Sequence, residues 1–262
     1  METQTDLLQF DKNYKAVLKV WNVTSSDEPD TNDSDPALTN PILTNILNQS
    51  ANVTWILDIR TRRFTFISEN TRELFGYEAV NYIDKGQIFH EGIKHAEDAA
   101  NSWKLICSIW NVLTVIPAAN RAGYKFSYDY RIIRPDGNVV RLLEQSSVLQ
   151  QDSRGDITHL LGVCTDITQW KKNGTQLASL SSSKDKQYFL FNSESDGAKS
   201  ILSKREIEIL KLISEGHSSK YIADKLFISF HTVNTHRQKM IEKTNTKNTG
   251  GLVQFAVCNG LI

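Results

Sequence analysis

The residues of this sequence with the best defined chemistry are three polar side chains between residues 229 and 243. If that stretch forms a helix that buries Val233 and Met240, then Asn234, Thr235 and Gln238 share its outward face, because neighbours on one face lie three or four residues apart. Asn and Gln can form paired hydrogen bonds with the N6 and N7 edge of adenine, and the methyl group of Thr can pack against thymine. The spacing therefore predicts that these residues contact DNA bases.

Basic and hydroxyl side chains around this helix predict contacts with DNA phosphates. They are Ser218, Lys220, Thr232, His236, Arg237, Lys239 and Lys243. Cations and the amides at helix N-termini both attract anions. Two of these residues have an alternative role inside the protein: Lys243 as the partner of a nearby glutamate, and His236 in helix packing. We expect Arg205, Glu206 and Glu208 to form ion pairs within the domain.

Charge is distributed unevenly along the 262 residues, although 30 basic and 30 acidic side chains balance in the whole chain. Residues 1–48 hold three basic and eight acidic side chains, whereas residues 198–262 hold ten basic and five acidic ones. A basic C-terminal region favours a polyanionic partner.

The sequence lacks the motifs of common enzymes and metal sites. It contains no GxxxxGK[ST], GxGxxG, GxSxG or HExxH motif, so we predict no catalytic residue and no enzymatic activity. No Cys or carboxylate lies at ligand spacing from His217, His231 and His236, so no metal site is predicted. The three cysteines are scattered, and no apolar run approaches the roughly 18–20 residues of a membrane span. We therefore expect a cytoplasmic protein without a membrane partner.

Four short helices are predicted in residues 198–262 to position these side chains. Ser203 begins a capping box before an apolar stripe, and Gly216 follows that stripe as a left-handed terminal residue would. The next helices are expected to begin near Ser218, at Ser229 and near Asn248. A tight connection between the second and third helices is typical of a helix-turn-helix.

The motifs of this region closely resemble the LuxR-type DNA-binding domain. The agreement runs through Leu202-Ser203-x-Arg205-Glu206-x-Glu208-Ile209-Leu210, Gly216-x-Ser218-Ser219-Lys220-x-Ile222-Ala223 and Thr232-Val233-x-x-His236. The resemblance implies an all-α, four-helix domain over residues 198–262 whose third helix enters the major groove, usually in a dimer on paired half-sites. In that family the positions of Asn234, Thr235 and Gln238 contact bases, with basic residues common at the first and third. Asn and Gln here imply a preference directed less to guanine and more to adenine.

Residues 50–170 show strand and helix patterns in an α+β order. Strands are predicted over 53–59 and 63–68, helices between about 70 and 120, and strands over 124–133, 139–150 and 159–165. This order, the segment Phe64–Asn70 leading to Phe75-Gly76-Tyr77, and the turn Arg134-Pro135-Asp136-Gly137 resemble a PAS domain, which we place at 49–170. That resemblance implies a five-stranded antiparallel sheet with helices over one face, often enclosing a small-molecule pocket.

Aromatic residues of the PAS-like domain are candidates for its core or for the wall of an apolar ligand pocket. The pocket candidates are Trp55, Phe66, Trp103, Trp110 and Tyr128. No cofactor is predicted, because Cys107 lacks the Asn-Cys-Arg context of flavin photoreceptors, and His90 and His95 are interpreted as surface or turn residues and not as haem ligands. A small-molecule ligand of unknown identity stays an alternative.

The remaining segments are predicted to connect or flank these domains. Within residues 1–48, an amphipathic helix over 5–22 either packs on the next domain or mediates dimerisation, and an Asp-, Ser- and Pro-rich loop covers 25–41. Residues 171–197 are interpreted as a Ser- and Lys-rich linker with one docking segment at 188–191.

Together these features predict a transcription regulator whose PAS-like domain senses a signal or mediates dimerisation and controls a helix-turn-helix. The expected partners are double-stranded DNA, a second copy of the chain in a homodimer and, as a further candidate, RNA polymerase. The alternative is a protein-interaction scaffold without a specific DNA target. The salt dependence of DNA affinity separates the two, because phosphate contacts release counterions.

Overall fold

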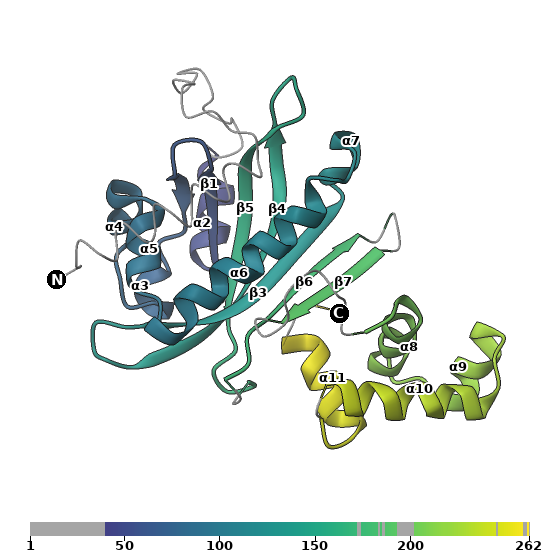
Figure 1. The fold of residues 1–262 in the computed structure, drawn as a ribbon. Coiled ribbons are helices and arrows are strands. Elements are labelled where there is room, and N and C mark those ends of the chain that lie inside the picture. The colour runs from purple at the N-terminus through teal and green to yellow at the C-terminus, as the bar shows by residue number, and fades with distance from the viewer. Residues whose placement is uncertain are drawn as a thin grey trace.

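The computed structural model describes residues 40–171, 174–182, 184, 187–192, 202–244, 246–258 and 261. The helix expected over residues 5–22 and most of the loop expected over 25–41 lie outside the described residues. The described part forms a sheet domain packed with helices and a smaller helical unit at its C-terminal end (Figure 1). Within these ranges no helix is long and apolar enough to cross a membrane.

A seven-stranded antiparallel sheet forms the framework of the first domain. Its strands are β1 (Val53–Asp58), β2 (Arg63–Ile67), β3 (Tyr124–Ile133), β4 (Val139–Gln151), β5 (Ile157–Asp166), β6 (Leu177–Ser182) and β7 (Gln187–Asn192). In space they follow the order β2-β1-β5-β4-β3-β6-β7. The bounds of β1 to β5 agree closely with the strands expected from the sequence, and a turn with the hydrogen bond Arg134 N to Asn138 O joins β3 to β4.

Strands β6 and β7 make this sheet larger than the five-stranded sheet that the resemblance implied. They form a hairpin within residues that the sequence analysis assigned to a linker, and β6 pairs with the free edge of β3. Small and polar residues conceal β6 in the sequence, and the apolar residues of β7 were interpreted as a docking segment within a linker. Ala178 and Leu180 are nevertheless buried, because helix α6 (Ala96–Leu113) packs against β6 and β7. The expected count of five strands is therefore corrected to seven.

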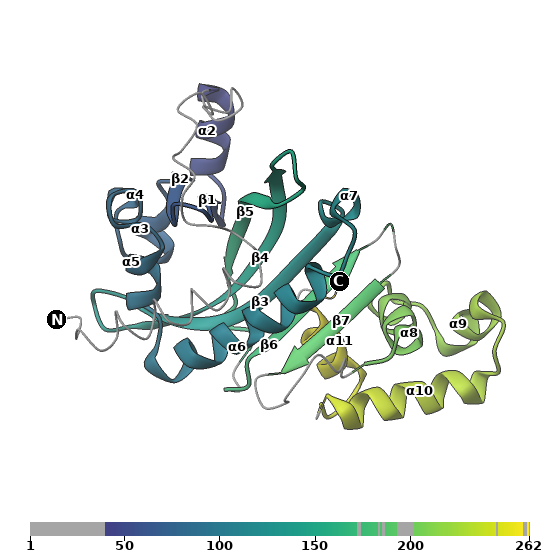
Figure 2. The same ribbon diagram turned by 45° about the horizontal axis from the view of Figure 1, so that its top comes forward.

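The long helix α6 and the short helix α4 (Ala79–Lys85) pack against the sheet, whereas α2 (Pro41–Asn48) and α7 (Ala118–Arg121) bury none of their residues. The other described helices here are α3 (Thr71–Leu74) and α5 (Gln87–Gly92). Helix α6 runs beside β3 and carries Trp103 and Trp110 into the core, as both views show for the helix (Figures 1 and 2). The ring of Trp110 packs edge-on against Phe126 of β3, with 5.6 Å between ring centroids.

The C-terminal unit contains helices α8 (Lys204–Ser214), α9 (Ser219–Leu226), α10 (Phe230–Lys243) and α11 (Thr249–Cys258). Ser203, Ser218 and Ser229 each accept a hydrogen bond from an amide in the first turn of the helix that follows, as the sequence predicted. Gly216 has a φ of 84° after α8, which only glycine adopts without strain. This unit has its own hydrophobic core, which includes Ile209, Leu210, Ile222, Val233, Met240 and Leu252.

Strand β7 contributes to both cores. Leu190 belongs to the core of the C-terminal helices, whereas its neighbour Phe191 belongs to the core of the sheet domain. Successive side chains of a strand point to opposite faces, so a single strand can serve both units. The side-chain amide of Gln254 in α11 also donates to the carbonyl oxygen of Trp170. Strand β7 and helix α11 therefore connect the two units through direct contacts.

Candidate nucleic-acid interface and ligand pocket

The turn between α9 and α10 presents the N-terminus of α10 at the surface. Phe227 ends α9 in the left-handed conformation, with a φ of 53°, and Ser229 caps α10 two residues later. This short link has the helix-turn-helix geometry that the sequence predicted, with α10 as the second helix. Figure 2 shows α10 at the rim of the molecule, apart from the sheet.

The three residues predicted to contact bases lie together on the outer face of α10. Asn234, Thr235 and Gln238 are exposed, while Val233 and Met240 are fully buried on the opposite face. The helix is held from behind by its own core, so this face needs no other contact to stay in place. The polar groups of this face are therefore accessible to a binding partner.

Two local hydrogen bonds shape this face. The Thr235 hydroxyl donates to the backbone oxygen of His231 at 3.0 Å, so its methyl group is the part left for an apolar contact. The Gln238 amide donates to the Glu242 carboxylate at 3.0 Å. This bond lies on an exposed surface, where a base edge can replace either partner at low cost.

Four of the residues expected at phosphates lie at the surface around the start of α9 and along α10. Lys220 and Lys239 are exposed and form no ion pair with the described residues. Ser218 and Thr232 lie at the N-termini of α9 and α10, and each takes part in the hydrogen bonds of its helix cap. These positions combine exposed cations with helix N-termini, which both favour an anion.

Three other residues expected at phosphates are partly committed inside the domain. Arg237 donates to Ser219 Oγ at 2.8 Å and to Thr249 Oγ1 at 3.0 Å, so it joins α10 to α9 and α11. Lys243 Nζ lies 2.8 and 2.9 Å from the two carboxylate oxygens of Glu206. His236 is half-buried. Of the alternatives left open by the sequence, the structure thus shows the glutamate pairing of Lys243.

The Glu206 carboxylate is the buried anchor of this unit. Burial acts to raise its pKa, but hydrogen bonds from Lys243 and from the Ser203 amide outweigh burial, and the pKa of Glu206 lies below its ordinary value. The expected ion pair between Arg205 and Glu208 is also present, at 2.7 Å. These contacts fix the helices that carry the exposed face.

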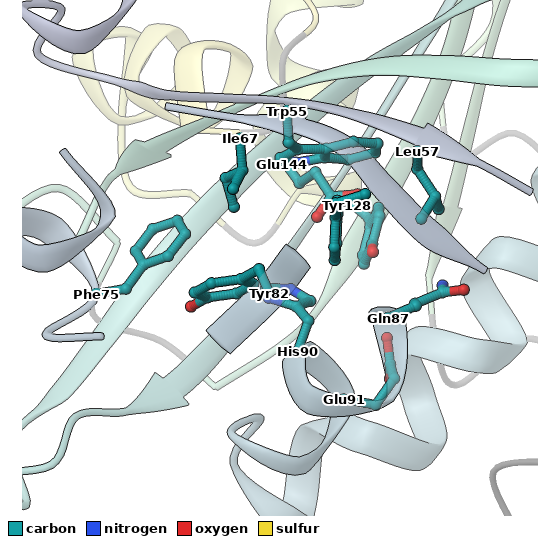
Figure 3. A pocket seen from close by; sticks show the side chains of 11 residues that line it. Trp55, Leu57, Ile67, Phe75, Tyr82, Gln87, His90, Glu91, Tyr128 and Glu144 are labelled. Carbon is teal, nitrogen blue, oxygen red and sulfur yellow. The ribbon is translucent and has the colours of Figure 1, made fainter. Parts of the chain in front are cut away.

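A cavity of about 30 Å³ lies between the sheet and helices α3 to α5 (Figure 3). Its walls are formed by Trp55, Leu57, Phe64, Ile67, Phe75, Tyr82, Gln87, His90, Glu91, Tyr128 and Glu144. Strand register sets the sheet wall, because Tyr128 lies opposite Glu144 and Glu144 lies opposite Cys164. Trp55 lies opposite Gly162, where an added Cβ would come within 2.1 Å of the indole. Gly162 therefore gives Trp55 the room to cover the cavity.

A chain of buried polar groups crosses this pocket. The Tyr130 hydroxyl donates to Glu144 Oε2 at 2.6 Å and lies 2.7 Å from His90 Nε2. Because its single hydrogen goes to Glu144, His90 Nε2 must donate to it. Lys94 Nζ, which is completely buried, donates to Glu91 Oε1 at 2.7 Å.

Burial controls the protonation of this chain. Desolvation lowers the pKa of His90 well below its ordinary value, and the Lys94 cation acts in the same direction. Desolvation raises the pKa of Glu144, while Lys94 and the hydrogen bond from Tyr130 oppose that change. Burial also raises the pKa values of Tyr128 and Tyr130. The histidine and both phenols are therefore neutral near pH 7.

The structure places the predicted pocket residues in two groups. Trp55 and Tyr128 line the cavity, whereas Phe66, Trp103 and Trp110 are not among its lining residues. Both tryptophans of α6 pack in the core beside β3. Two of the five residues predicted to line the pocket therefore do so, and both lie on strands of the sheet.

The interpretation of His90 as a surface or turn residue was wrong. His90 is only 7% exposed, because α5 turns it toward Tyr130 of the sheet. Sequence reasoning also missed Glu91, Lys94 and Glu144. Glu144 carried a signal, since it is an acidic residue inside a strand whose neighbours Leu142 and Leu143 are apolar. Among the described residues, no group of His, Cys, Asp and Glu side chains is arranged to hold a metal ion.

Comparisons with known families identify both domains. Residues 200–256 match the bacterial regulatory proteins of the luxR family, and residues 64–164 match the PAS fold. The chain is 47% identical over 62 residues to the oxygen regulatory protein NreC of Staphylococcus carnosus, which is 24% of this chain and 29% of NreC. It is 42% identical over 79 residues to NreC of Staphylococcus aureus, which is 28% of this chain and 36% of that protein. The chain thus spans about a third of the length of these relatives.

Solved structures show only a distant likeness. One is the Vibrio cholerae VqmA dimer in the absence of target DNA, which is described as a LuxR-type receptor. The match covers 83% of this chain and 86% of VqmA at 20% identity, with a TM-score of 0.34. The VqmA structure bound to DPO covers 83% of this chain and 86% of VqmA at 17% identity, with a TM-score of 0.33. Scores at this level do not establish a shared arrangement of the domains.

Proposed function

Because residues 200–256 match the luxR family of bacterial regulatory proteins and residues 64–164 match the PAS fold, we propose that the chain binds specific DNA sequences and that its PAS domain controls this binding in response to a small molecule. Helix α10 enters the major groove in this proposal. Asn234, Thr235 and Gln238 contact bases, with a preference directed toward adenine. Lys220, Lys239, Ser218 and Thr232 hold the phosphates on either side.

The observation that carries this proposal is the exposed polar face of α10. Its three base-contacting candidates are all exposed, and only Gln238 is engaged by a neighbouring side chain. A helix that packed against another part of the chain would bury such residues behind apolar contacts. Here the apolar contacts lie on the opposite face, at Val233 and Met240.

Two copies of the chain bind paired half-sites in this proposal. One recognition helix covers only a few base pairs, so a homodimer supplies both the affinity and the symmetry of the site. The PAS domain would set the distance between the two copies of α10, since β7 links its core to that of the DNA-binding helices. A ligand that favours one arrangement would change DNA affinity by its differential affinity for the two arrangements.

Selection of bound sequences from a pool of random DNA by the full chain tests the proposal. We expect enrichment of two related half-sites. We also expect the DNA affinity to fall about 10-fold or more between 50 and 200 mM salt, because several phosphate contacts release counterions. An affinity independent of salt and a pool without an enriched motif would favour the protein-interaction scaffold instead.

A further inference from the structure

The pocket of the PAS domain contains polar atoms that nothing in the described structure satisfies. Tyr82 Oη, Gln87 Oε1 and Glu91 Oε2 are buried and have no hydrogen-bond partner among the described residues, and all three residues line the cavity. Buried polar groups almost always have a partner, because leaving one unpaired costs stability. Gln87 Oε1 and Glu91 Oε2 lie on the same side of the cavity and indicate a site that is completed by a hydrogen-bonding molecule, whereas the Tyr82 hydroxyl points toward Phe75 (Figure 3).

The unpaired atoms define the hydrogen bonds that this molecule must make. The amide oxygen of Gln87 and the carboxylate oxygen of Glu91 accept hydrogen bonds and cannot donate them, while the Tyr82 hydroxyl can do both. Figure 3 shows Gln87 and Glu91 close together on the helix side of the cavity, opposite the sheet residue Leu57. An occupant that reaches this side must therefore present N–H or O–H groups.

The charges around the cavity disfavour an anion. None of the lining residues is Lys or Arg. The nearby cation, Lys94, is already bound to Glu91 and lies 4.5 Å from the centroid of the Tyr130 ring. Glu144 adds a second carboxyl group on the sheet wall. A carboxylate or phosphate would enter this poorly hydrated space beside two acidic side chains without a cation to neutralise it.

The rest of the cavity limits the size and shape of the occupant. Aromatic rings of Trp55, Phe64, Phe75 and Tyr128 form much of its wall, and flat molecules pack well against such rings. The cavity of about 30 Å³ has room for about two water molecules as it stands. Gln87 is half-buried, so its side chain can shift to admit a small ring.

We propose that the PAS pocket binds a small, flat, uncharged molecule whose N–H or O–H group donates to the acceptor pair formed by Gln87 Oε1 and Glu91 Oε2. This inference rests on the proposed function, since it names the class of ligand to which the PAS domain responds. The aromatic wall covers the ring. The pocket discriminates against the same ring carrying a carboxylate, because Glu91 and Glu144 repel it.

Pyrrole, furan and 2-furoate test this proposal with the full chain and no DNA. The three share a five-membered ring, but only pyrrole donates an N–H, and 2-furoate adds a negative charge. In saturation-transfer NMR we expect pyrrole to bind at least tenfold more tightly than furan, and 2-furoate not to bind. Tight binding of furan or 2-furoate, or no binding of pyrrole, would overturn the proposal.

A substitution that removes an unpaired atom separates ligand binding from a structural role. Gln87→Leu should weaken pyrrole binding about tenfold while leaving Tm unchanged or raised, because it removes a polar atom that lacks a partner among the described residues. Gln145→Leu makes the Gln87 change at an exposed position of β4 and should leave pyrrole binding unchanged. A fall of several degrees in Tm for Gln87→Leu would show that its amide oxygen holds ordered water only, and would overturn the proposal.

The DNA-binding activity of the same preparations keeps the two proposals apart. A chain that enriches a DNA motif but shows no preference for pyrrole retains the proposed function and loses the inferred ligand class. A chain that binds pyrrole as expected but enriches no motif loses the proposed function and keeps the pocket chemistry.

Discussion

The PAS domain buries many of its charged side chains, whereas the described DNA-binding helices bury only one of theirs. The buried ones in the PAS domain include Asp58, Lys94, Asp98, Asp129, Arg141 and Glu144. In the described part of the C-terminal unit, Glu206 is the one charged residue that is buried. A buried charge needs a defined partner, which is either another side chain, so that the pair holds the fold in place, or a bound ligand. Exposed charges stay available to a polyanion, whose counterions they release on binding.

The PAS domain itself contains two kinds of buried polar cluster. Asp129 is completely buried and fully paired: Arg141 Nη1 lies 2.7 Å from one of its oxygens, and Lys171 Nζ lies 2.6 Å from the other, which also accepts from the Leu177 amide at 3.1 Å. The pocket cluster leaves Glu91 Oε2 unpaired toward a cavity. We interpret the first cluster as structural, since it fastens the start of β6 to the sheet, and the second as a binding site.

Asp129→Asn should have the largest effect, since it leaves Arg141 and Lys171 buried without their full counter-charge. Removal of one partner from a buried ion pair typically costs about 3–5 kcal/mol, and we expect a loss of that size in the free energy of unfolding. Urea denaturation of the full chain measures it. Glu208→Gln, which breaks an exposed pair with Arg205, should cost less than about 1 kcal/mol. Equal losses for both variants would remove the distinction between buried and exposed charges.

Gln238→Ala tests the exposed face of α10. It should weaken binding to the selected DNA by about 1–3 kcal/mol and relax the preference at one base pair, while leaving the free energy of unfolding nearly unchanged, because Gln238 is exposed. Titration of selected and random DNA gives both affinities, and Gln145→Ala on β4 serves as the control. An equal loss on both DNAs would reject a role in base recognition.

Regular periodicity in the sequence predicted much of the fold. Strands β1 to β5 and the caps of α8, α9 and α10 agree with the structure because their signals are local: β-rich runs between turns, glycines at 137 and 216, and a serine before each of three helices. The β6–β7 hairpin was not predicted. The apolar residues 188–191 of β7 were noticed but interpreted as a docking segment, because the pairing of β6 with β3 and the packing against α6 leave no local pattern in the small and polar residues of β6.

The DNA-binding face and the pocket also differ in how far the sequence predicts them. The outward face of α10 follows from helical spacing once Val233 and Met240 are buried. The pocket does not, because it joins α5 to β3 and β4 across about 40–55 positions of the chain, as in the contact between His90 and Tyr130. The sequence predicted Trp55 and Tyr128, which line the cavity, but none of its polar residues.

His90→Gln tests whether the pocket cluster titrates as a buried one. The pKa of His90 is well below 6.5 in the folded state, so below pH 6.5 the unfolded chain takes up a proton that the folded protein does not. Stability should therefore fall with decreasing pH, by up to about 1.4 kcal/mol per pH unit from this residue. Glutamine keeps a donor toward Tyr130 but cannot titrate, so the variant should show a shallower dependence between pH 6.5 and 5. An unchanged dependence would show that His90 is accessible to protons in the folded protein.

Lys220→Ala should produce the smallest change and the one most specific to the exposed surface. Loss of one phosphate contact should lower the slope of log affinity against log salt concentration by about 1, and should weaken binding to selected and random DNA alike. Stability should stay within about 0.5 kcal/mol, because Lys220 is exposed. Lys104→Ala removes an equally exposed cation from α6 of the PAS domain and should leave the slope unchanged. If both variants lowered the slope to the same extent, the DNA would have to reach the PAS domain as well, and the separation of buried charge from exposed charge would no longer follow the domain boundary.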